Sequence, residues 1–230
     1  MAPSPLFSHA AHLPIESVVV VGAGGNGSIF ITHLARIWQA WTKLGGKPFR
    51  ISIYDPDVVT EANLARQVFC EADIGQYKAL VLAQRIRAFV GVPVIPVAGK
   101  YTAGSDSVVV GCVDNLAARR TMQTVTAESY WLDLGNDAHS GQVVLGGHGL
   151  PTFFDVLPAM KKAKDPKSTP SCSMAEALSK QDLFINSTVA TLGGHLLWQL
   201  MRHGGLNHHG YFVNLKEGIV LPLSVTKKEK

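Results

Sequence analysis

Short apolar runs alternate with helical patterns along the chain up to residue 134. Five of these runs have the length and composition of buried strands. They lie at residues 16–21, 49–54, 93–97, 107–113 and 131–134. Helical periodicity separates most of them, at residues 26–44, 76–90 and 115–128. Strands that alternate with helices predict right-handed crossovers, and therefore an α/β fold with a mainly parallel sheet flanked by helices.

The pattern changes after residue 134. A polar-flanked run at residues 142–145 predicts a strand that turns back, which would give the sheet an antiparallel edge. Residues 149–171 are rich in proline and lysine and show no clear period. Because loops of this length are typically lids, binding loops or crossovers, we expect a long crossover loop here.

Residues 183–201 contain no Asp, Glu, Lys or Arg, which suggests a transmembrane span. The polar side chains within this segment argue against that interpretation. They are Asn186, Ser187, Thr188, His195 and Gln199. We therefore expect no membrane contact and a helix that is buried in the core or in a dimer interface.

The composition fits one globular domain over residues 1–230. Of the 230 residues, 47% are hydrophobic and 17% charged, against about 25% charged in an average soluble protein. The deficit of charge suggests a homodimer interface. Within the domain, we expect residues 1–15 to form a flexible arm and residues 224–230 a basic tail. The start lacks the basic region and long apolar stretch of a secretory signal, so export is not expected.

The cysteines and the net charge indicate the cellular compartment and exclude some classes of partner. Cys70, Cys112 and Cys172 are odd in number and widely spaced, so they predict neither a disulfide framework nor a structural zinc site, and they favour a reducing cytoplasm. Cys70 and Cys112 are interpreted as core residues. The formal charge is +4, but many lysines lie at residues 161–167 and in the tail without interleaved aromatics, which argues against direct nucleic-acid binding.

A glycine-rich turn follows the first strand and opens the first helix. It contains Gly22, Gly24, Gly25 and Gly27, and its backbone N–H groups can approach phosphate oxygens closely. Asp55 ends the second strand, where an acid can accept both ribose hydroxyls. The same turn serves NAD, FAD and ATP folds, so it predicts a nucleotide without naming it. A tight structural turn is the alternative.

Two cations distinguish between nucleotides. Lys78 is expected in the first turn of its helix, with Asp73 as N-cap, where the helix dipole opposes a cation unless an anion binds. Arg66 precedes it on the segment that leaves the second strand, between Asn63 and Gln67. Both cations could converge on phosphates above the carboxyl edge of the sheet. Taken alone, Lys78 fits a solvated surface lysine better, and the presence of Asn63, Arg66 and Gln67 reverses that preference.

Asp114 follows the apolar strand at residues 107–113. A carboxylate at this strand end faces the ligand crevice and could bind Mg²⁺. The alternative is a helix N-cap. Together with the two cations, Asp114 favours a magnesium triphosphate over a dinucleotide.

These residues form an ordered set that resembles the ThiF/MoeB and ubiquitin-activating enzymes. The resemblance runs from Val18 to about Val144, on a Rossmann-like sheet. The motifs are Gly22-x-Gly24-Gly25-x-Gly27, Asp55-x-Asp57, Asn63-Leu-x-Arg66-Gln67, Gly75-x-x-Lys78 and Asp114-Asn115. The remainder is similar to the ThiF member of the plasmid-borne PRTRC cassette.

The resemblance implies that the C-terminal carboxylate of a small ubiquitin-like or sulfur-carrier protein, of β-grasp type, attacks the α-phosphorus of MgATP. The products would be an acyl-adenylate and pyrophosphate. By the same resemblance, Asp55 holds the ribose, with Asp57 in the same motif, and Asp114 binds Mg²⁺. The residues implied around the phosphates are Asn63, Arg66, Gln67 and Lys78.

Two departures from the family pattern stand out. The chain has no paired CxxC motifs for zinc, and residues 1–15 contain no Arg or Lys to match the N-terminal arginine of MoeB-like dimers. The Pro170-x-Cys172 setting is similar to that of the catalytic cysteine in ubiquitin-activating enzymes. Capping-box spacing from Ser173 to Glu176 places Cys172 before a helix N-terminus, which favours a thiolate. Cys172 is thus either a thioester-forming nucleophile or an ordinary free cysteine.

Two other functions remain open at this point. An NAD-dependent oxidoreductase is supported by the glycine turn and Asp55 alone. A non-catalytic scaffold would bind ATP without activating a partner carboxylate.

Overall fold

An eight-stranded sheet forms the centre of the protein in the computed structural model, which describes residues 7–11, 14–64, 66–165 and 179–225. The strand order is β10-β9-β7-β6-β5-β2-β3-β4. These strands are β2 (Ser17–Val21), β3 (Arg50–Tyr54), β4 (Ile95–Val97), β5 (Val108–Gly111), β6 (Tyr130–Asn136), β7 (Ser140–Gly146), β9 (His208–Asn214) and β10 (Ile219–Ser224).

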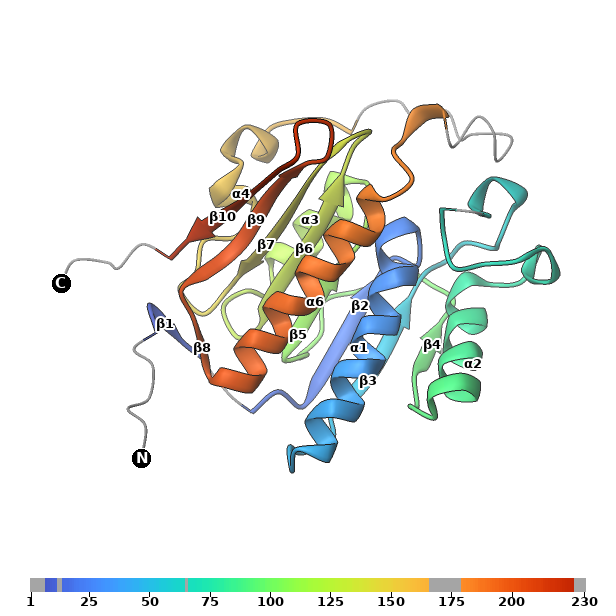
Figure 1. Ribbon diagram of the computed structural model, residues 1–230, viewed down its shortest axis with the longest axis horizontal. Helices are drawn as coiled ribbons and strands as arrows, with labels where there is room; N and C mark the ends of the chain where they lie inside the picture. Colours follow the sequence, from blue (N-terminus) through green and yellow to red (C-terminus); the bar gives the residue numbers. More distant parts are fainter. Residues whose placement is uncertain (1–6, 12–13, 65, 166–178, 226–230) are drawn as a thin grey trace.

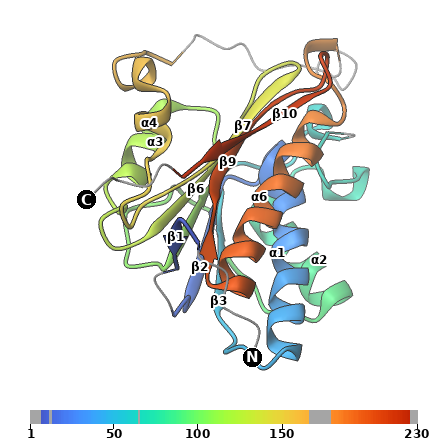
Figure 2. The same ribbon diagram turned by 60° about the vertical axis from the view of Figure 1, so that its left-hand side comes forward.

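The sheet is parallel from β6 through β5, β2 and β3 to β4. From β6 outward through β7 and β9 to β10 each pairing is antiparallel, and β10 lies at the outer edge (Figure 2). The predicted α/β fold, mainly parallel with an antiparallel edge, is therefore confirmed.

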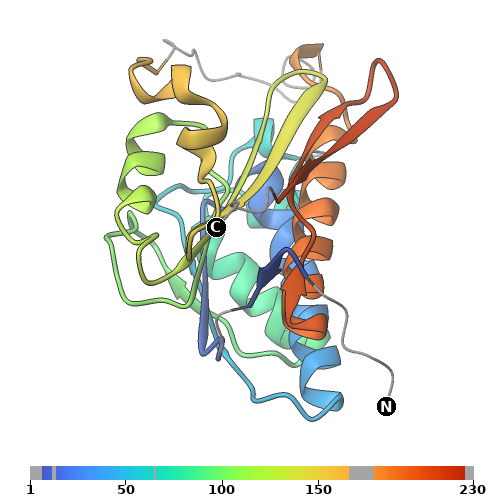
Figure 3. The same cartoon turned by 90° about the vertical axis from the view of Figure 1, so that its left-hand side faces the viewer.

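Helices cover both faces of the sheet. Figures 1 and 3 show α1, α2 and α6 on one face and α3 and α4 on the other. The helices are α1 (Gly25–Lys43), α2 (Lys78–Val90), α3 (Leu116–Gln123), α4 (Phe153–Val156) and α6 (Ile185–His203). Short 3-10 turns lie at Glu61–Asn63, Glu71–Asp73 and Pro158–Lys161.

The main core lies between the sheet and the pair α1 and α6. The apolar face of α1 buries Phe30 and Leu34, and α6 buries Leu197 and Leu200 against the strands. A second apolar cluster fills the other face, where Trp131 packs against Phe153 and Phe154, whose rings also contact each other. Burying both faces explains why the central strands are continuous apolar runs in the sequence.

Most predicted elements lie within a few residues of their observed bounds, but β9 and β10, which follow α6, were not predicted, and there are two further differences. The helix predicted over residues 115–128 ends at Gln123, because Thr124 to Glu128 form successive turns. Within the arm predicted at residues 1–15, His9–Ala10 forms β1, which pairs with β8 (Gly205–Leu206).

The region predicted as a crossover loop is only partly irregular. The described part contains α4 and the turn Pro158–Lys161, and residues 166–171 lie outside the described residues. The uncharged segment at residues 183–201 forms most of α6, whose inner face is buried in the core while Thr191 and His195 are exposed. Among the described helices, none combines the length and apolarity needed to cross a membrane.

Candidate functional site

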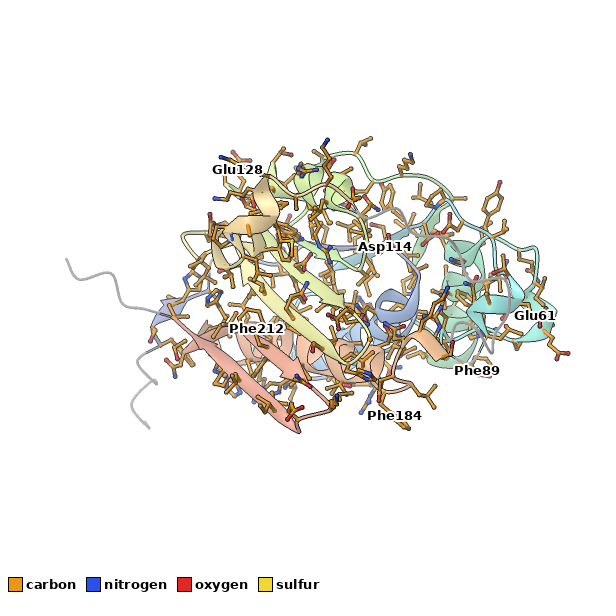
Figure 4. All side chains as sticks on the ribbon, turned by 90° about the horizontal axis from the view of Figure 1, so that it is seen from above. Glu61, Phe89, Asp114, Glu128, Phe184 and Phe212 are labelled. Carbon is orange, nitrogen blue, oxygen red and sulfur yellow. The ribbon has the colours of Figure 1, made fainter. Side chains whose placement is uncertain are left out.

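An open cleft of about 1480 Å³ lies at the carboxyl ends of the parallel strands. Its lining comes from the glycine turn, the end of β3, the segment from Asp57 to Gln67, the start of α2, and the β5–α3 junction. It continues across β6 and β7 to Phe212 on β9. Figure 4 looks onto this end of the molecule, with Asp114 between the segment that carries Glu61 and the strand that carries Phe212. Open α/β sheets bind their ligands in this crevice.

Close contacts fix the glycine turn. Gly22 has a φ of +96°, and a Cβ there would lie 2.6 Å from the carbonyl oxygen of Cys112. A Cβ on Gly27 would lie 1.8 Å from the carbonyl oxygen of Gly22, and one on Gly25 would lie 2.5 Å from Asn186 Oδ1. Gly24 is different, because a Cβ there would meet nothing within 4 Å. The turn thus packs tightly on three sides and is open at Gly24.

The start of α1 is open to an anion. Gly24 is the N-cap, so no side chain caps the first turn, which also carries no acidic residue. The uncapped N–H groups and the positive end of a 19-residue helix therefore point toward the cleft, and no acidic side chain of the helix's own first turn competes for them.

The two glycines Gly24 and Gly27 should separate ligand binding from stability. Gly27→Ala should lower the free energy of unfolding by about 1–3 kcal/mol, because its methyl group meets fixed backbone. Gly24→Ala should melt close to wild type but bind nucleotide more weakly, because its methyl group enters the cleft. Thermal melting with and without MgATP measures both effects. Equal melting of the two apo variants would contradict this assignment.

Asp55 is held rigidly below the turn. Its residue is 5% exposed, Oδ2 accepts the Ala23 N–H at 2.6 Å and Oδ1 accepts the Asp57 N–H at 2.8 Å. Burial raises the pKa of the carboxyl group, and these two backbone hydrogen bonds oppose that rise. Asp55 lines the cleft, and each oxygen keeps a lone pair for a ligand hydroxyl.

Lys78 is a buried cation at a helix N-terminus. It is the first residue of α2, its side chain is 8% exposed, and Nζ lies 3.4 Å from Asp57 Oδ2, whose own side chain is 66% exposed. The position in the first turn was predicted correctly. The proposed N-cap, Asp73, is wrong: its carboxylate accepts the Cys70 N–H and pairs with Arg85 at 2.7 Å. The helix dipole and burial both disfavour a cation at Lys78 unless an anion joins it.

Arg66, Gln67 and Asn63 line the same cleft. The Arg66 guanidinium donates from Nη1 to Gln181 Oε1 at 2.7 Å, and its Nε is buried without a hydrogen-bond partner. Gln67 Oε1 is likewise buried and unpartnered. Asn63 Oδ1 accepts the N–H of Thr60 at 2.9 Å, so this side chain also closes a local turn. The fold therefore brings the two cations to the cleft that contains the glycine turn.

Asp114 is exposed at the end of β5 and lines the cleft. It does not cap α3, because Asn115 is the N-cap and accepts the Ala118 N–H at 2.8 Å. The carboxylate is therefore available to a cation. Among the described residues, no group of three His, Cys, Asp or Glu side chains could hold a metal ion. One carboxylate plus ligand phosphates and water is the usual protein contribution to a Mg²⁺ site, and Asp114 fits that pattern.

The cysteines differ from one another. Cys112 is half-buried against the core, as predicted, and burial raises the pKa of its thiol, which disfavours a nucleophilic thiolate. The prediction that Cys70 is a core residue is wrong, since it is exposed before the turn Glu71–Asp73. Cys172 lies outside the described residues.

Several residues in and below the cleft were not predicted from the sequence. Tyr54 and Tyr101 form an edge-to-face pair with ring centroids 5.4 Å apart, beside Asp55. Arg119 Nε donates to the fully buried Asp133 at 2.8 Å, below the cleft. Tyr54 directly precedes Asp55 at a strand end, a position that could have indicated it. The partner of each pair lies on another element, so neither contact has a local signal.

The model of the ThiF family matches residues 9–209. The chain belongs to the ThiF family. This match includes every described residue of the glycine turn and both cations, and it extends through α6 to the start of β9.

Relatives of this ThiF-family protein include the SAMP-activating enzyme E1 of Haloferax volcanii. It is 36% identical over 118 residues, which cover 47% of this chain and 40% of the relative. A crystal structure of E. coli MccB has a TM-score of 0.66 at 18% identity, over 91% of this chain and 64% of MccB. The crystal structure of PaaA has a TM-score of 0.65 at 15% identity, over 91% of this chain and 64% of PaaA.

The likeness to MccB and PaaA shows the fold of the ThiF-family protein, a mostly parallel Rossmann-like sheet with an antiparallel edge. Crystal structures of MccB have been solved with ATP and with AMPCPP and MccA. The chain spans less than two thirds of the length of each of these relatives.

Proposed function

We propose that this ThiF-family protein is an ATP-dependent adenylating enzyme that activates the C-terminal carboxylate of a small protein. The observation that carries the proposal is the meeting of Lys78, Arg66 and the open glycine turn in one cleft. Lys78 is buried with the exposed Asp57 carboxylate at 3.4 Å and the buried Asp55 nearby, and Arg66 has a buried Nε without a partner. A triphosphate supplies the negative charge and the acceptors that these groups lack.

The same features favour a triphosphate over NAD. A dinucleotide fold uses the glycine turn and one ribose-binding acid, and it leaves no role for a buried lysine and a half-buried arginine in the cleft. The Tyr54 and Tyr101 rings offer an apolar wall for a base beside Asp55, whose carboxylate would accept the ribose hydroxyls.

The proposed reaction is attack of a carboxylate oxygen on the α-phosphorus of ATP. The new bond joins the carboxylate to AMP, and the bond to the departing pyrophosphate breaks. Arg66 and Lys78 would stabilise the charge that moves onto pyrophosphate, each contributing on the order of 3 kcal/mol. Asp114 would hold Mg²⁺, which neutralises phosphate charge when bound. Gln67 and Asn63 would orient the phosphates.

The size of the cleft supports a polypeptide as second substrate. Its volume of about 1480 Å³ exceeds the usual 300–1,000 Å³ of small-ligand pockets, and it continues past the cations to Phe212 and Val213 on β9. The MccB structures with MccA and the SAMP-activating relative fit this choice. We propose a small β-grasp carrier protein as this substrate, as the resemblance to the PRTRC cassette member implies. We also propose that the protein is a homodimer in the cytoplasm.

ATP–pyrophosphate exchange tests the proposal with Asp114→Asn. Exchange should fall by about 100-fold or more, because the carboxylate available to Mg²⁺ is lost. Glu128→Gln, an exposed acid outside the cleft, is the matched control and should retain activity. Full exchange by Asp114→Asn would contradict its role. ATP binding without exchange for any offered β-grasp protein would favour a non-catalytic scaffold.

We further propose that Cys172 accepts the acyl group from the adenylate as a thioester, releasing AMP. Cys172→Ser should keep pyrophosphate exchange and replace a thiol-sensitive adduct by a thiol-resistant ester, or by none. Gel mobility of the adduct with and without thiol is the measurement. Cys70→Ser, at an exposed cysteine, is the control. An unchanged thiol-sensitive adduct would place the nucleophile elsewhere.

A further inference from the structure

The side-chain amide of Gln181 joins Arg66 to the second half of the chain. Its Oε1 accepts Nη1 of Arg66 at 2.7 Å and Nδ2 of Asn186 at 3.3 Å, and its Nε2 donates to the carbonyl oxygen of Asp137 at 3.2 Å. Gln181 lies just before α6, and Asp137 lies in the turn between β6 and β7. One amide therefore connects the arginine to two other elements of the cleft.

The same amide reaches the glycine turn through Asn186. Asn186 is 3% exposed in the first turn of α6, and its amide oxygen lies where a side chain on Gly25 would begin. Gln181 is thus fixed on one side by Asn186, against the glycine turn, and on the other by the backbone of Asp137. An acceptor held from two sides can fix the direction of the group that donates to it.

Arg66 depends on this acceptor. Within the described residues, no carboxylate lies within ion-pair distance of its guanidinium, and Gln181 accepts its side-chain hydrogen bond. Burial lowers the pKa of Arg66, because no nearby anion compensates for the loss of water. A neutral amide orients the guanidinium without neutralising its charge, which stays available to an anionic ligand.

We propose that Gln181 is a positioning residue for Arg66, and that it must be neutral to serve this role. The inference rests on the proposed nucleotide site, because it requires that Arg66 contacts the phosphates. It predicts that the chemistry at position 181 changes affinity for the phosphates and leaves recognition of the nucleoside unchanged.

Two substitutions separate positioning from simple support of the fold. Gln181→Ala removes the acceptor, so Arg66 keeps its charge and loses its orientation; we expect about tenfold weaker ATP binding. Gln181→Glu keeps an acceptor of the same shape for Arg66 and Asn186, loses the donor to the Asp137 carbonyl oxygen and adds an anion. If Gln181 only supported the fold, both variants would weaken ATP and adenosine binding by the same factor. We expect at least a further tenfold loss of ATP binding alone in Gln181→Glu, because the carboxylate competes with phosphate for Arg66.

The experiment measures dissociation constants of MgATP and of adenosine for the full chain by calorimetry, with melting of each variant as a check of folding. Gln39→Ala is the control, since its amide donates to the carbonyl oxygen of Val90, away from the cleft. The expected result is a ratio of ATP to adenosine affinity that falls from wild type through Gln181→Ala to Gln181→Glu, with adenosine binding unchanged. If Gln181→Ala does not fold, the ratio for Gln181→Glu against wild type decides.

Three results would overturn the inference. Equal loss of ATP and adenosine affinity would mean that Gln181 supports the fold alone. A Gln181→Glu variant that binds ATP as wild type does would mean that its neutrality is irrelevant, while the proposed function stands. A wild-type protein that binds neither ligand would overturn the proposed function as well.

Discussion

Replacing Lys78 by alanine is expected to reduce ATP–pyrophosphate exchange by at least about 100-fold. The ammonium group is buried at the start of α2, 3.4 Å from a carboxylate that is itself mostly in solvent. Asp57 and the buried Asp55 compensate part of its charge before a ligand binds, and the ammonium group can also interact with the charge that builds up on pyrophosphate. This is the condition under which an electrostatic group favours the transition state.

The stability of the Lys78→Ala variant should separate this role from a structural one. Removing a buried cation with a loosely held partner should leave the melting temperature of the apo protein unchanged or slightly raised. The increase in melting temperature that MgATP gives to the wild type should be lost. Lys47→Ala, at an exposed lysine after α1, is the control and should keep both exchange and the ligand-induced increase. Substantial exchange by Lys78→Ala would remove Lys78 from the proposed mechanism.

Replacing Arg119 by alanine should lower the free energy of unfolding by about 3–5 kcal/mol, the largest stability effect that we predict. The Asp133 side chain is fully buried and accepts from Arg119 Nε at 2.8 Å and from Gln142 Nε2 at 3.3 Å. The guanidinium also lies over the ring of Phe153, 4.8 Å from its centroid. Without Arg119, a buried carboxylate keeps one neutral hydrogen-bond donor.

The pH dependence of this effect has a definite sign. Burial raises the pKa of Asp133 and Arg119 opposes the rise, so Arg119→Ala should raise it further. A carboxyl group with a folded-state pKa above its unfolded-state value of about 3.9 costs stability as pH rises between the two values. The loss in Arg119→Ala should therefore be smaller at about pH 5 than at about pH 8, as measured by urea unfolding.

The neighbouring arginine provides the control for Arg119. Arg120 is exposed on α3 and donates to the carbonyl oxygen of Ala163, so Arg120→Ala should cost less than about 1 kcal/mol. Equal unfolding free energies for Arg119→Ala and wild type would contradict the buried ion pair.

The sequence predicts the elements well because each central strand is buried on both faces and each long helix has one apolar face. Residues 17–21 and 108–111 are recognisable without any knowledge of their neighbours. The cleft residues that follow these strands could be predicted for the same reason, since parallel strands end at one edge. Gly22 and Asp55 come directly after a strand, and Asp114 follows the end of β5 by three residues.

Contacts between distant segments could not be predicted from the sequence. Gln181 donates to and accepts from residues of three other segments, and nothing in its own neighbourhood signals this. Asp73 was predicted as the N-cap of the helix that contains Lys78, but its carboxylate pairs with Arg85, which lies further along the same helix. His9–Ala10 has no strand pattern of its own and becomes β1 because β8 lies beside it.

The two hydrogen bonds of Asp55 to the backbone limit what an Asp55→Ala substitution can show about ribose recognition. Its two oxygens tether Ala23 of the glycine turn and Asp57, whose own carbonyl receives the first N–H of α2. Removing this carboxyl group would therefore destabilise both the glycine turn and the start of α2. Loss of ATP binding in an Asp55→Ala variant would therefore not show that Asp55 contacts the ribose. Binding of 2′-deoxy-ATP to the wild-type protein is the cleaner test.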